Sequence, residues 1–553
     1  MFLFKLIKIF CFEKFSIIRK MSRVEKTIFI TSALPYVNNI PHLGNIIGST
    51  LSGDVISRYF REKGKRVIYL CGTDEHGSTT TVRAKKENLS PNILCENYRQ
   101  EHEKIYDWFN INFDAWGRTS TETHSELVCE IFSNLYKNGF IEEIAEERIY
   151  CEACNLFLAD RYVKGTCYIC QNESNGDQCD NCNSLINANK LIAPKCSICS
   201  QEPVLKDTKN LYLSLTKIKE TIEEYHKTCK WTKNAASIVK TWLNSKEGLK
   251  SRCITRDCDW GVKVPLKGYE QKSFYVWFEA PIGYFSILKA NGFECKPDFE
   301  WISFQGKDNV FFHTILFPAT IIGSEKKLPL INKISATEYL LFENKKFSKS
   351  NGIGINGKQV IKLSEKLGFN EDYWRFYLLK IRPETSDSSF SLKDFLWSTR
   401  KDLVGNIGNF INRCVCLTNK FCNGTTKFVS FENIPSRFSN IFEQYENFMT
   451  NLKIRKAVQS CLDIGNQCHN LLGTEEPWFL FKTDYEKAFD VLSLCNSILY
   501  FLLKALKPFI PSTVEKLESC ISIGKNHISF SAAFEKPFKM IKDQEIKQCI
   551  EDF

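Results

Sequence analysis

Four Cys-x-x-Cys pairs between Cys151 and Cys199 constrain this chain more than any other feature. A zinc ion needs four soft ligands in a tetrahedron, and each pair supplies two thiolates on one side. The other sixteen of the 24 cysteines are scattered, as free thiols are in a reducing cytosol, so metal binding is favoured over disulfides. We expect two structural Zn²⁺ sites, built from Cys151, Cys154, Cys167, Cys170, Cys179, Cys182, Cys196 and Cys199.

The spacing leaves the pairing of these cysteines open. The two middle pairs are separated by eight residues and would form a short knuckle, with the outer pairs closing the second site in a nested arrangement. Sequential pairing, first with second and third with fourth, is the alternative.

Chain length, net charge and the length of apolar runs limit the class of protein more broadly. At 553 residues the chain is too long for one core, and three or four structural units are expected. The net charge of +10 suits a polyanionic partner without requiring one. No uninterrupted apolar run approaches the roughly 18–20 residues needed to cross a bilayer, so we expect a soluble protein without a membrane partner.

The first twenty residues differ from the rest. They mix Phe, Ile and Leu with five basic residues and one acid. A mitochondrial presequence is one interpretation, although such segments are usually rich in Arg and Ser. The other is a leader or upstream extension, with Met21 beginning the folded protein.

Two separated segments have the pattern of a parallel α/β sheet. An apolar run at 27–31 precedes a Pro/Asn loop and a helical periodicity at 43–59, and a second apolar run follows at 67–70. The same succession of strand, loop and helix returns at 301–322. A nucleotide-binding sheet split by the cysteine-rich insert is therefore predicted. From about residue 394, long helical periodicities predict an all-helical terminal domain.

The tetrapeptide His42-Leu43-Gly44-Asn45 lies where the first loop meets the first helix. Backbone N–H groups and the helix dipole favour a phosphate there, and glycine permits close approach of a nucleotide. By itself the motif is weak, because a capping His-Gly turn has the same sequence.

The pentapeptide Lys346-Phe347-Ser348-Lys349-Ser350 lies about 300 residues later. Two lysines three residues apart, with serines and glycines, form a cationic loop suited to a pyrophosphate leaving group. Taken alone it would be a solvated basic turn. The two motifs together, on either side of a split α/β fold, are far more specific.

These motifs and five further blocks resemble the methionyl-tRNA synthetases of the class I aminoacyl-tRNA synthetases, especially the eukaryotic cytosolic and archaeal kind. The resemblance covers residues 26 to about 520. The blocks lie at 31–39, 71–77 (Cys-Gly-Thr-Asp-Glu-His-Gly), 252–257, 275–284 (Tyr-Val-Trp-Phe-Glu-Ala-Pro-Ile-Gly-Tyr) and 306–309 (Gly-Lys-Asp-Asn). Glu279 departs from the family, which usually has Asp there, and no role is transferred to it.

The resemblance implies the following site residues. Catalysis is expected from His42, Asn45, Lys346 and Lys349, and ATP binding from these together with Gly44, Arg256, Lys307, Asp308 and Ser348. Methionine would be bound by Ala33, Leu34, Tyr36, Asp74, Trp277, Ala280, Pro281, Tyr284 and His313. Asp74 would take the ammonium group, and the apolar and aromatic walls would suit a polarisable thioether. The anticodon would be read by Asn409, Arg413 and Trp478.

The resemblance also implies a domain order. We expect a leader at 1–20, the two halves of a Rossmann-type catalytic domain at 21–118 and 246–330, and a connective insert at 119–245 with its double zinc knuckle at 151–199. A stem-contact region with the KFSKS loop follows at 331–393, and an α-helical anticodon-binding domain at 394–553.

The implied activity is that of a cytoplasmic methionine–tRNA ligase. It would form methionyl-adenylate from methionine and Mg²⁺-ATP and transfer the methionyl group to initiator and elongator tRNA. Since no appended oligomerisation domain is evident, we expect a monomer. A nucleotidyltransferase would lack the insert and the helical domain, and a non-catalytic tRNA-binding paralogue would be expected to lose His42 or the loop lysines. The leucine, isoleucine and valine enzymes carry a large editing insert, and neither they nor the cysteine enzyme account for Tyr36, Asp74, Trp277 and His313.

Overall fold

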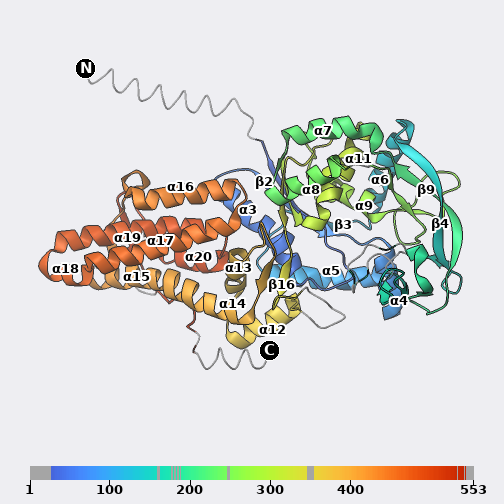
Figure 1. Cartoon of the computed structure of the whole chain (residues 1–553). Helices are drawn as coiled ribbons and strands as arrows, with labels where there is room; N and C mark the ends of the chain where they lie inside the picture. Colours follow the sequence, from blue (N-terminus) through green and yellow to red (C-terminus); the bar gives the residue numbers. More distant parts are fainter. Residues whose placement is uncertain are drawn as a thin grey trace, which may run out of the picture.

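The structure is a computed structural model. Its two main parts lie end to end along the long axis of the molecule (Figure 1). It describes residues 26–158, 162–175, 188–245, 249–345, 354–531 and 534–540, with Cys179, Cys182, Ile186 and Lys542. One part is built on a parallel sheet and carries a long ribbon at its far end. The other is a bundle of helices.

A six-stranded parallel sheet organises the first part, in the order β10-β15-β14-β1-β2-β3. Side chains alternate across it: Ile28 and Ile30 of β1 pack into one core, while Phe29 packs into a second core on the opposite face. Because both faces are covered, the four central strands β15, β14, β1 and β2 are almost wholly buried. The strands are β1 (Ile28–Ser32), β2 (Val67–Thr73), β3 (Ala115–Arg118), β10 (Lys230–Trp231), β14 (Glu300–Gly306) and β15 (Lys333–Thr337).

The sheet is split as the sequence predicts. β1 and β14 are adjacent and in register from Ile28↔Glu300 to Ser32↔Phe304, although the whole insert separates them in the chain. The helices around the sheet are α3 (Leu51–Glu62), α4 (Ser78–Glu87), α5 (Pro91–Trp108), α6 (Glu122–Lys137), α7 (Lys219–Thr228), α8 (Lys233–Leu243), α9 (Val276–Glu279), α10 (Gly283–Ala290) and α11 (Phe317–Gly323).

The insert extends from the sheet as an antiparallel ribbon whose long strands are β4 (Ile141–Cys151) and β9 (Val204–Leu213) (Figure 1). The short strands β5 (Leu156–Phe157) and β11 (Arg252–Cys253) flank them in a four-stranded sheet. Near the end of the ribbon lie β5 and the short strands β6 (Val163–Thr166), β7 (Glu173–Asn175) and β8 (Ile192–Cys196). The cysteine pairs are carried by this small region, which has its own core of cysteine, Leu, Ile and Val side chains.

The C-terminal part is helical, with one addition to the predicted pattern. Its helices are α15 (Asn409–Phe421), α16 (Ser436–Thr450), α17 (Ile454–Glu475), α18 (Pro477–Thr483), α19 (Tyr485–Leu506) and α20 (Pro511–Glu518). The addition is a three-stranded antiparallel sheet of β18 (Thr425–Lys427), β20 (His527–Phe530) and β19 (Ile521–Ile523). Periodicity missed these strands because each has only three or four residues. Residue 394, the expected start of the helical domain, lies inside α14 (Leu392–Ser398).

Within the described part of the chain, α19 is the one helix long and apolar enough, by length and composition, to cross a membrane. In the structure 61% of its apolar window is buried. It packs against α15 and α17, which is the position of a core helix in a bundle.

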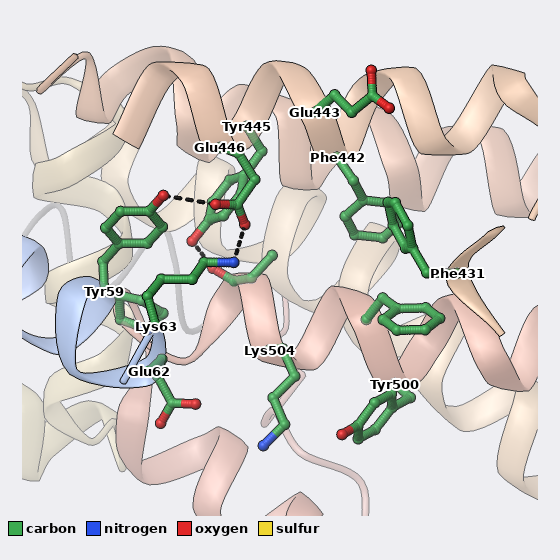
Figure 2. A pocket seen from close by; sticks show the side chains of 13 residues that line it. Tyr59, Glu62, Lys63, Phe431, Phe442, Glu443, Tyr445, Glu446, Tyr500 and Lys504 are labelled. Carbon is green, nitrogen blue, oxygen red and sulfur yellow. Dashed lines mark hydrogen bonds and ion pairs between the residues drawn. The ribbon is translucent and has the colours of Figure 1, made fainter. Parts of the chain in front are cut away.

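The two parts meet along α3 and α13 (Glu371–Lys380). Arg375 of α13 is fully buried, donates to Asp54 of α3 at 2.7 Å, and also reaches the carbonyl oxygens of Pro508 and Phe509 at 2.9 and 3.1 Å. At the end of α3, Tyr59 donates to Glu446 of α16 at 2.6 Å (Figure 2). A cavity of about 690 Å³ lies beside this contact, between α3, α16 and α19.

Candidate functional site

His42 caps the helix that begins the α/β unit. Its Nδ1 accepts a hydrogen bond from the N–H of Gly44 at 3.1 Å, and the Asn45 side chain accepts from the N–H of His42 at 3.1 Å. In the neutral ring an accepting Nδ1 places the proton on Nε2. A Cβ on Gly44 would lie 2.9 Å from the imidazole, so glycine is needed for the ring to lie over this turn. Three of the four motif residues therefore act as one capping unit at a helix N-terminus, where a phosphate is favoured.

Several of the residues expected to bind methionine contact one another near the carboxyl ends of β1 and β2. Asp74 and Tyr36 lie side by side, since the N–H of Asp74 donates to the carbonyl of Pro35 at 2.9 Å. The ring of Tyr36 meets Trp277 edge to face at 6.1 Å, and Trp277 stacks on Phe312 at 4.0 Å. Ala33, Ala280, Pro281, Tyr284 and His313 are buried, and Leu34 is half-buried beside Gly283.

The Tyr284–His313 pair has a fixed hydrogen-bond direction. Nδ1 of His313 donates to the carbonyl of Asn309 at 3.0 Å, so Nε2 accepts from the Tyr284 hydroxyl at 2.8 Å. Burial lowers the pKa of His313 to about 4. The pair is thus neutral at physiological pH, which suits an uncharged thioether.

Asp74 differs from the neutral Tyr284–His313 pair, because it is an acidic group. It is 2% exposed, and its Oδ1 has no hydrogen-bond partner among the described residues. Burial raises its pKa well above the ordinary value, and the nearby carboxylates Glu279 and Glu75 raise it further. A buried, unpaired carboxylate of this kind is costly unless a cation binds it. The site therefore presents one buried carboxylate oxygen that a cation would stabilise.

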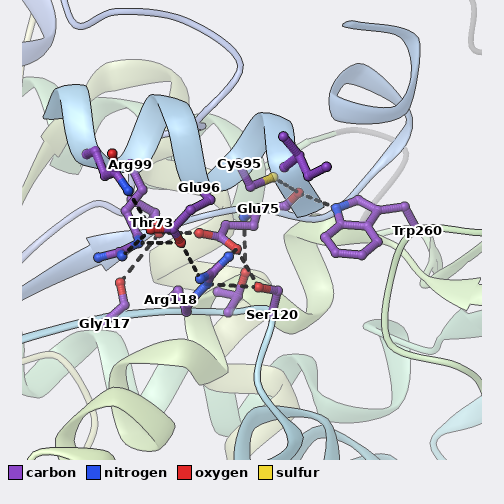
Figure 3. Close-up of polar contacts among 12 residues, drawn as sticks. Thr73, Glu75, Cys95, Glu96, Arg99, Gly117, Arg118, Ser120 and Trp260 are labelled. Carbon is purple, nitrogen blue, oxygen red and sulfur yellow. Dashed lines mark hydrogen bonds and ion pairs between the residues drawn. The ribbon is translucent and has the colours of Figure 1, made fainter. Parts of the chain in front are cut away.

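The adjacent carboxylate, Glu75, is fully paired (Figure 3). It accepts from Nε of Arg118 and from the hydroxyl of Thr73, both at 2.9 Å, and from the Ser120 hydroxyl. The indole N–H of Trp260 donates to its backbone carbonyl at 2.6 Å. Glu75 is therefore a structural anchor for the segment, and Asp74 is the carboxylate with an oxygen that has no hydrogen-bond partner among the described residues.

Three residues expected to bind ATP line a neighbouring cavity of about 530 Å³. Arg256 of β12 (Thr255–Arg256) lies over the ring of Tyr275 at 4.1 Å. Lys307 contacts Glu338 at 2.6 Å and Asp387 at 3.4 Å, and Asp308 accepts from the Tyr339 hydroxyl at 2.8 Å. Lys307 is thus held by carboxylates in this structure. Lys346, Ser348 and Lys349 lie outside the described residues.

The eight cysteines form two clusters in the nested arrangement. Cys151, Cys154, Cys196 and Cys199 form one, and Cys167, Cys170, Cys179 and Cys182 the other. Four Zn–S bonds of about 2.3 Å in a tetrahedron place neighbouring sulfurs about 3.8 Å apart. The closest Sγ–Sγ distances across the two clusters run from 3.4 to 4.0 Å. The donor sets and distances fit tetrahedral metal ions.

Comparison with known proteins decides the family. The family of class I tRNA synthetases (M) matches residues 28–415, and the anticodon-binding domain of methionyl-tRNA ligase matches residues 426–544. The chain belongs to the methionyl-tRNA synthetase family.

Named relatives support this membership along the whole chain. Methionine–tRNA ligase of Acanthamoeba polyphaga mimivirus is 44% identical over 550 residues, covering 95% of this chain and 99% of the viral one. The cytoplasmic enzyme of Homo sapiens is 40% identical over 517 residues, covering 90% of this chain but 57% of the human one. A crystal structure of Mycobacterium tuberculosis methionyl-tRNA synthetase bound by methionyl-adenylate matches with a TM-score of 0.72. At 19% identity, over 90% of this chain and 94% of that one, it supports the fold.

In the helical domain of this synthetase, two of the three expected anticodon residues are brought together. The guanidinium of Arg413 on α15 lies 5.0 Å from the ring of Trp478, which is the second residue of α18 and is half-buried. Asn409 is exposed one turn before Arg413 on the same helix. A half-buried indole beside a guanidinium is a surface on which a base can stack.

The sequence assigned no role to Glu279. Glu279 is fully buried and contacts His76 and His124. Its departure from the family pattern drew attention to it, but its partners are 203 and 155 residues away in the chain, and nothing local indicates them. Phe312, which stacks on Trp277, was missed for the same reason.

Proposed function

We propose that this chain is a methionine–tRNA ligase that activates methionine with ATP and transfers the product to methionine tRNA. The observation that carries the proposal is the unpartnered Oδ1 of Asp74, buried beside aromatic and apolar walls. The α-ammonium of the amino acid would occupy it. Tyr36, Trp277 and the neutral Tyr284–His313 pair would enclose the thioether.

Two steps follow. In the first, a carboxylate oxygen of methionine attacks the α-phosphorus of ATP, forming the acyl–phosphate bond and breaking the bond to pyrophosphate. In the second, the terminal 2′-hydroxyl of the tRNA attacks the acyl carbon and AMP leaves. His42 with Gly44 and Asn45 would hold phosphate at the helix N-terminus, and Lys346 and Lys349 would balance the charge on the leaving group. No side chain is needed as a covalent nucleophile.

Metals have separate roles in the proposal. Mg²⁺ would enter with ATP as its counter-ion. Zn²⁺ would be held by each cysteine cluster as a closed, four-ligand structural site, which stabilises the tip of the ribbon without chemistry. Metal analysis of the purified protein should find two zincs per chain, and one zinc would remove one cluster from this account.

The proposal extends to the partners. Arg413, Trp478 and Asn409 would read the anticodon of initiator and elongator methionine tRNA, and Arg256, Lys307 and Asp308 would contact the nucleotide. We propose a monomer that works in the cytoplasm, as the names of several relatives suggest for them. A stable dimer in light scattering would refute the monomer.

ATP–pyrophosphate exchange with each of the twenty amino acids tests the central claim. Methionine should support exchange, while leucine, isoleucine, valine and cysteine should be poor substrates. Absence of methionine-dependent exchange by a folded protein would overturn the proposed function.

A further inference from the structure

Glu279 lies at the junction between the two sides of the amino-acid pocket. It is the last residue of α9, two positions after Trp277 and directly before Ala280 and Pro281. Residues two apart on a helix do not share a face, so Glu279 and Trp277 point to different sides. Glu279 is fully buried, and its carboxylate is held inside the protein.

Two histidines from other elements contact that carboxylate. Nδ1 of His76 lies 3.2 Å from Oε1, and Nε2 of His124 lies 2.5 Å from Oε2. His76 comes two residues after Asp74, on the ammonium side of the pocket. His124 belongs to α6, and its second nitrogen lies 3.0 Å from the hydroxyl of Ser286 on α10. One carboxylate therefore connects the Asp74 segment, α6 and the pocket wall.

The electrostatic environment of Glu279 differs from that of Asp74, although both carboxylates are buried. Burial opposes ionisation of Glu279, but the charge of His76 and the hydrogen bond from His124 outweigh it and lower its pKa to about 2. The ionised form of Glu279 is thus stabilised by its own partners. Asp74, which lacks such partners, keeps its demand for a cation.

The distances favour a hydrogen-bonded network over a metal site. His76, His124 and Glu279 lie close enough together to be considered as metal ligands. Nitrogen and oxygen ligands about 2.1 Å from a tetrahedral Zn²⁺ would lie about 3.4 Å apart. Nε2 of His124 and Oε2 of Glu279 lie closer together than two ligands of one ion would, so their contact is a direct hydrogen bond.

We propose that Glu279, His76 and His124 form a positioning network for methionine, which fixes Asp74 relative to the Trp277–Pro281 wall. The inference rests on the proposed function and adds three residues to it. None of the three needs to touch the substrate. The network sets the distance between the site for the ammonium and the site for the side chain, so its loss weakens methionine recognition without affecting the phosphate site.

Glu279→Gln tests this with little change in shape. The amide carries no charge and only its oxygen accepts, so the charge is lost and one histidine must accept from the amide NH2 instead of donating. In ATP–pyrophosphate exchange, the KM for methionine should rise about tenfold or more, while the KM for ATP changes by less than about twofold. Glu279→Asp keeps the charge but is one methylene shorter, so its KM should lie between those of the wild type and Glu279→Gln.

The matched control is Glu518→Gln, which removes another carboxylate that carries two partners, Lys504 and Lys507, in the helical bundle. It should leave both KM values unchanged. Thermal melting of all variants separates positioning from folding. Equal rises in the KM for methionine and for ATP, or a KM for methionine that does not rise in a folded Glu279→Gln, would overturn the proposal.

A double-mutant cycle adds a second readout. If the network acts as a unit, adding His124→Gln to Glu279→Gln should raise the KM for methionine less than the product of the two single effects. Independent, multiplicative effects would refute it. Failure of the wild type to exchange with methionine would instead count against the proposed function, so the two failures are distinguishable.

Discussion

Replacement of Asp74 by asparagine should weaken methionine binding and stabilise the free protein at the same time. Asparagine has nearly the same shape but no charge, and it leaves Glu75 with Arg118 and Glu279 with its histidines. Those two carboxylates are already engaged by their own partners, so neither can replace Asp74 as the partner of an ammonium group.

The size of the binding effect follows from the lost contact. A hydrogen bond to a charged group contributes about 1.5–3 kcal/mol, and about 1.4 kcal/mol corresponds to a tenfold change in affinity. Asp74→Asn should therefore raise the KM for methionine by roughly 10–150-fold in ATP–pyrophosphate exchange. The KM for ATP should stay within about twofold, since the phosphate site around His42 is built from another loop.

The sign of the stability effect follows from the pKa. The folded-state pKa of Asp74 is raised above its ordinary value of 3.8, so the folded protein holds that proton more tightly than the unfolded chain. Stability is then lost as the pH rises from the unfolded pKa through the folded pKa. Asp74→Asn removes this loss, so the free variant should melt at a higher temperature than the wild type at neutral pH and at nearly the same temperature near pH 4.

Glu96→Gln is a control whose expected effect on stability at neutral pH has the opposite sign to that of Asp74→Asn. Hydrogen bonds from Arg99 and Gln100 lower the pKa of Glu96 to about 2, so its charge stabilises the fold above about pH 4. Glu96→Gln should lower the melting temperature slightly at neutral pH and leave the KM for methionine unchanged. If Asp74→Asn leaves that KM within threefold of the wild type, or melts earlier at neutral pH, the assignment of Asp74 is wrong.

Three further changes test other parts of the structure. Gly44→Ala should reduce kcat for exchange by about tenfold or more, because the new Cβ displaces the imidazole of His42; an unchanged kcat would refute that geometry. Arg375→Met should destabilise the junction by about 3–5 kcal/mol in urea unfolding, whereas Lys427→Met, at an exposed ion pair, should change it by less than about 0.5 kcal/mol. Chelation of zinc should make the end of the β4–β9 ribbon sensitive to protease while the helical bundle stays resistant, and equal resistance before and after chelation would contradict structural zinc.

The sequence predicted features whose residues are close together in the chain. His42, Gly44 and Asn45 make their contacts with one another, so the sequence motif is itself the helix cap. The split sheet was also predictable, because strand and helix periodicities are local and the cysteine-rich insert between them is unmistakable. Three-residue strands such as β18 have too few side chains to show an alternation, and they form only because β20 lies beside them.

Contacts between residues far apart in the chain could not be predicted from the sequence, for a physical reason. Equal Cys-x-x-Cys turns are interchangeable as ligands, and the nested arrangement follows from the ribbon, which brings Cys151 at the end of β4 near Cys196 and Cys199. In the same way, a glutamate in an apolar helix indicates that it needs partners but not which ones. His76 and His124 were identified only when the fold placed them against Glu279.

The phosphate motif and the bundle are joined by one uninterrupted helical stretch. His42 caps its first turn, the backbone continues as helix to Glu62, and Tyr59 in its last turn is fixed to Glu446 of α16. Asp54, halfway along, is held by Arg375 against the carbonyl oxygens of Pro508 and Phe509. A helix is stiff along its axis, so packing at the bundle end limits where the imidazole at the other end can lie. The bundle therefore contributes to the placement of His42, where we propose the phosphate site, and it also carries Arg413 and Trp478.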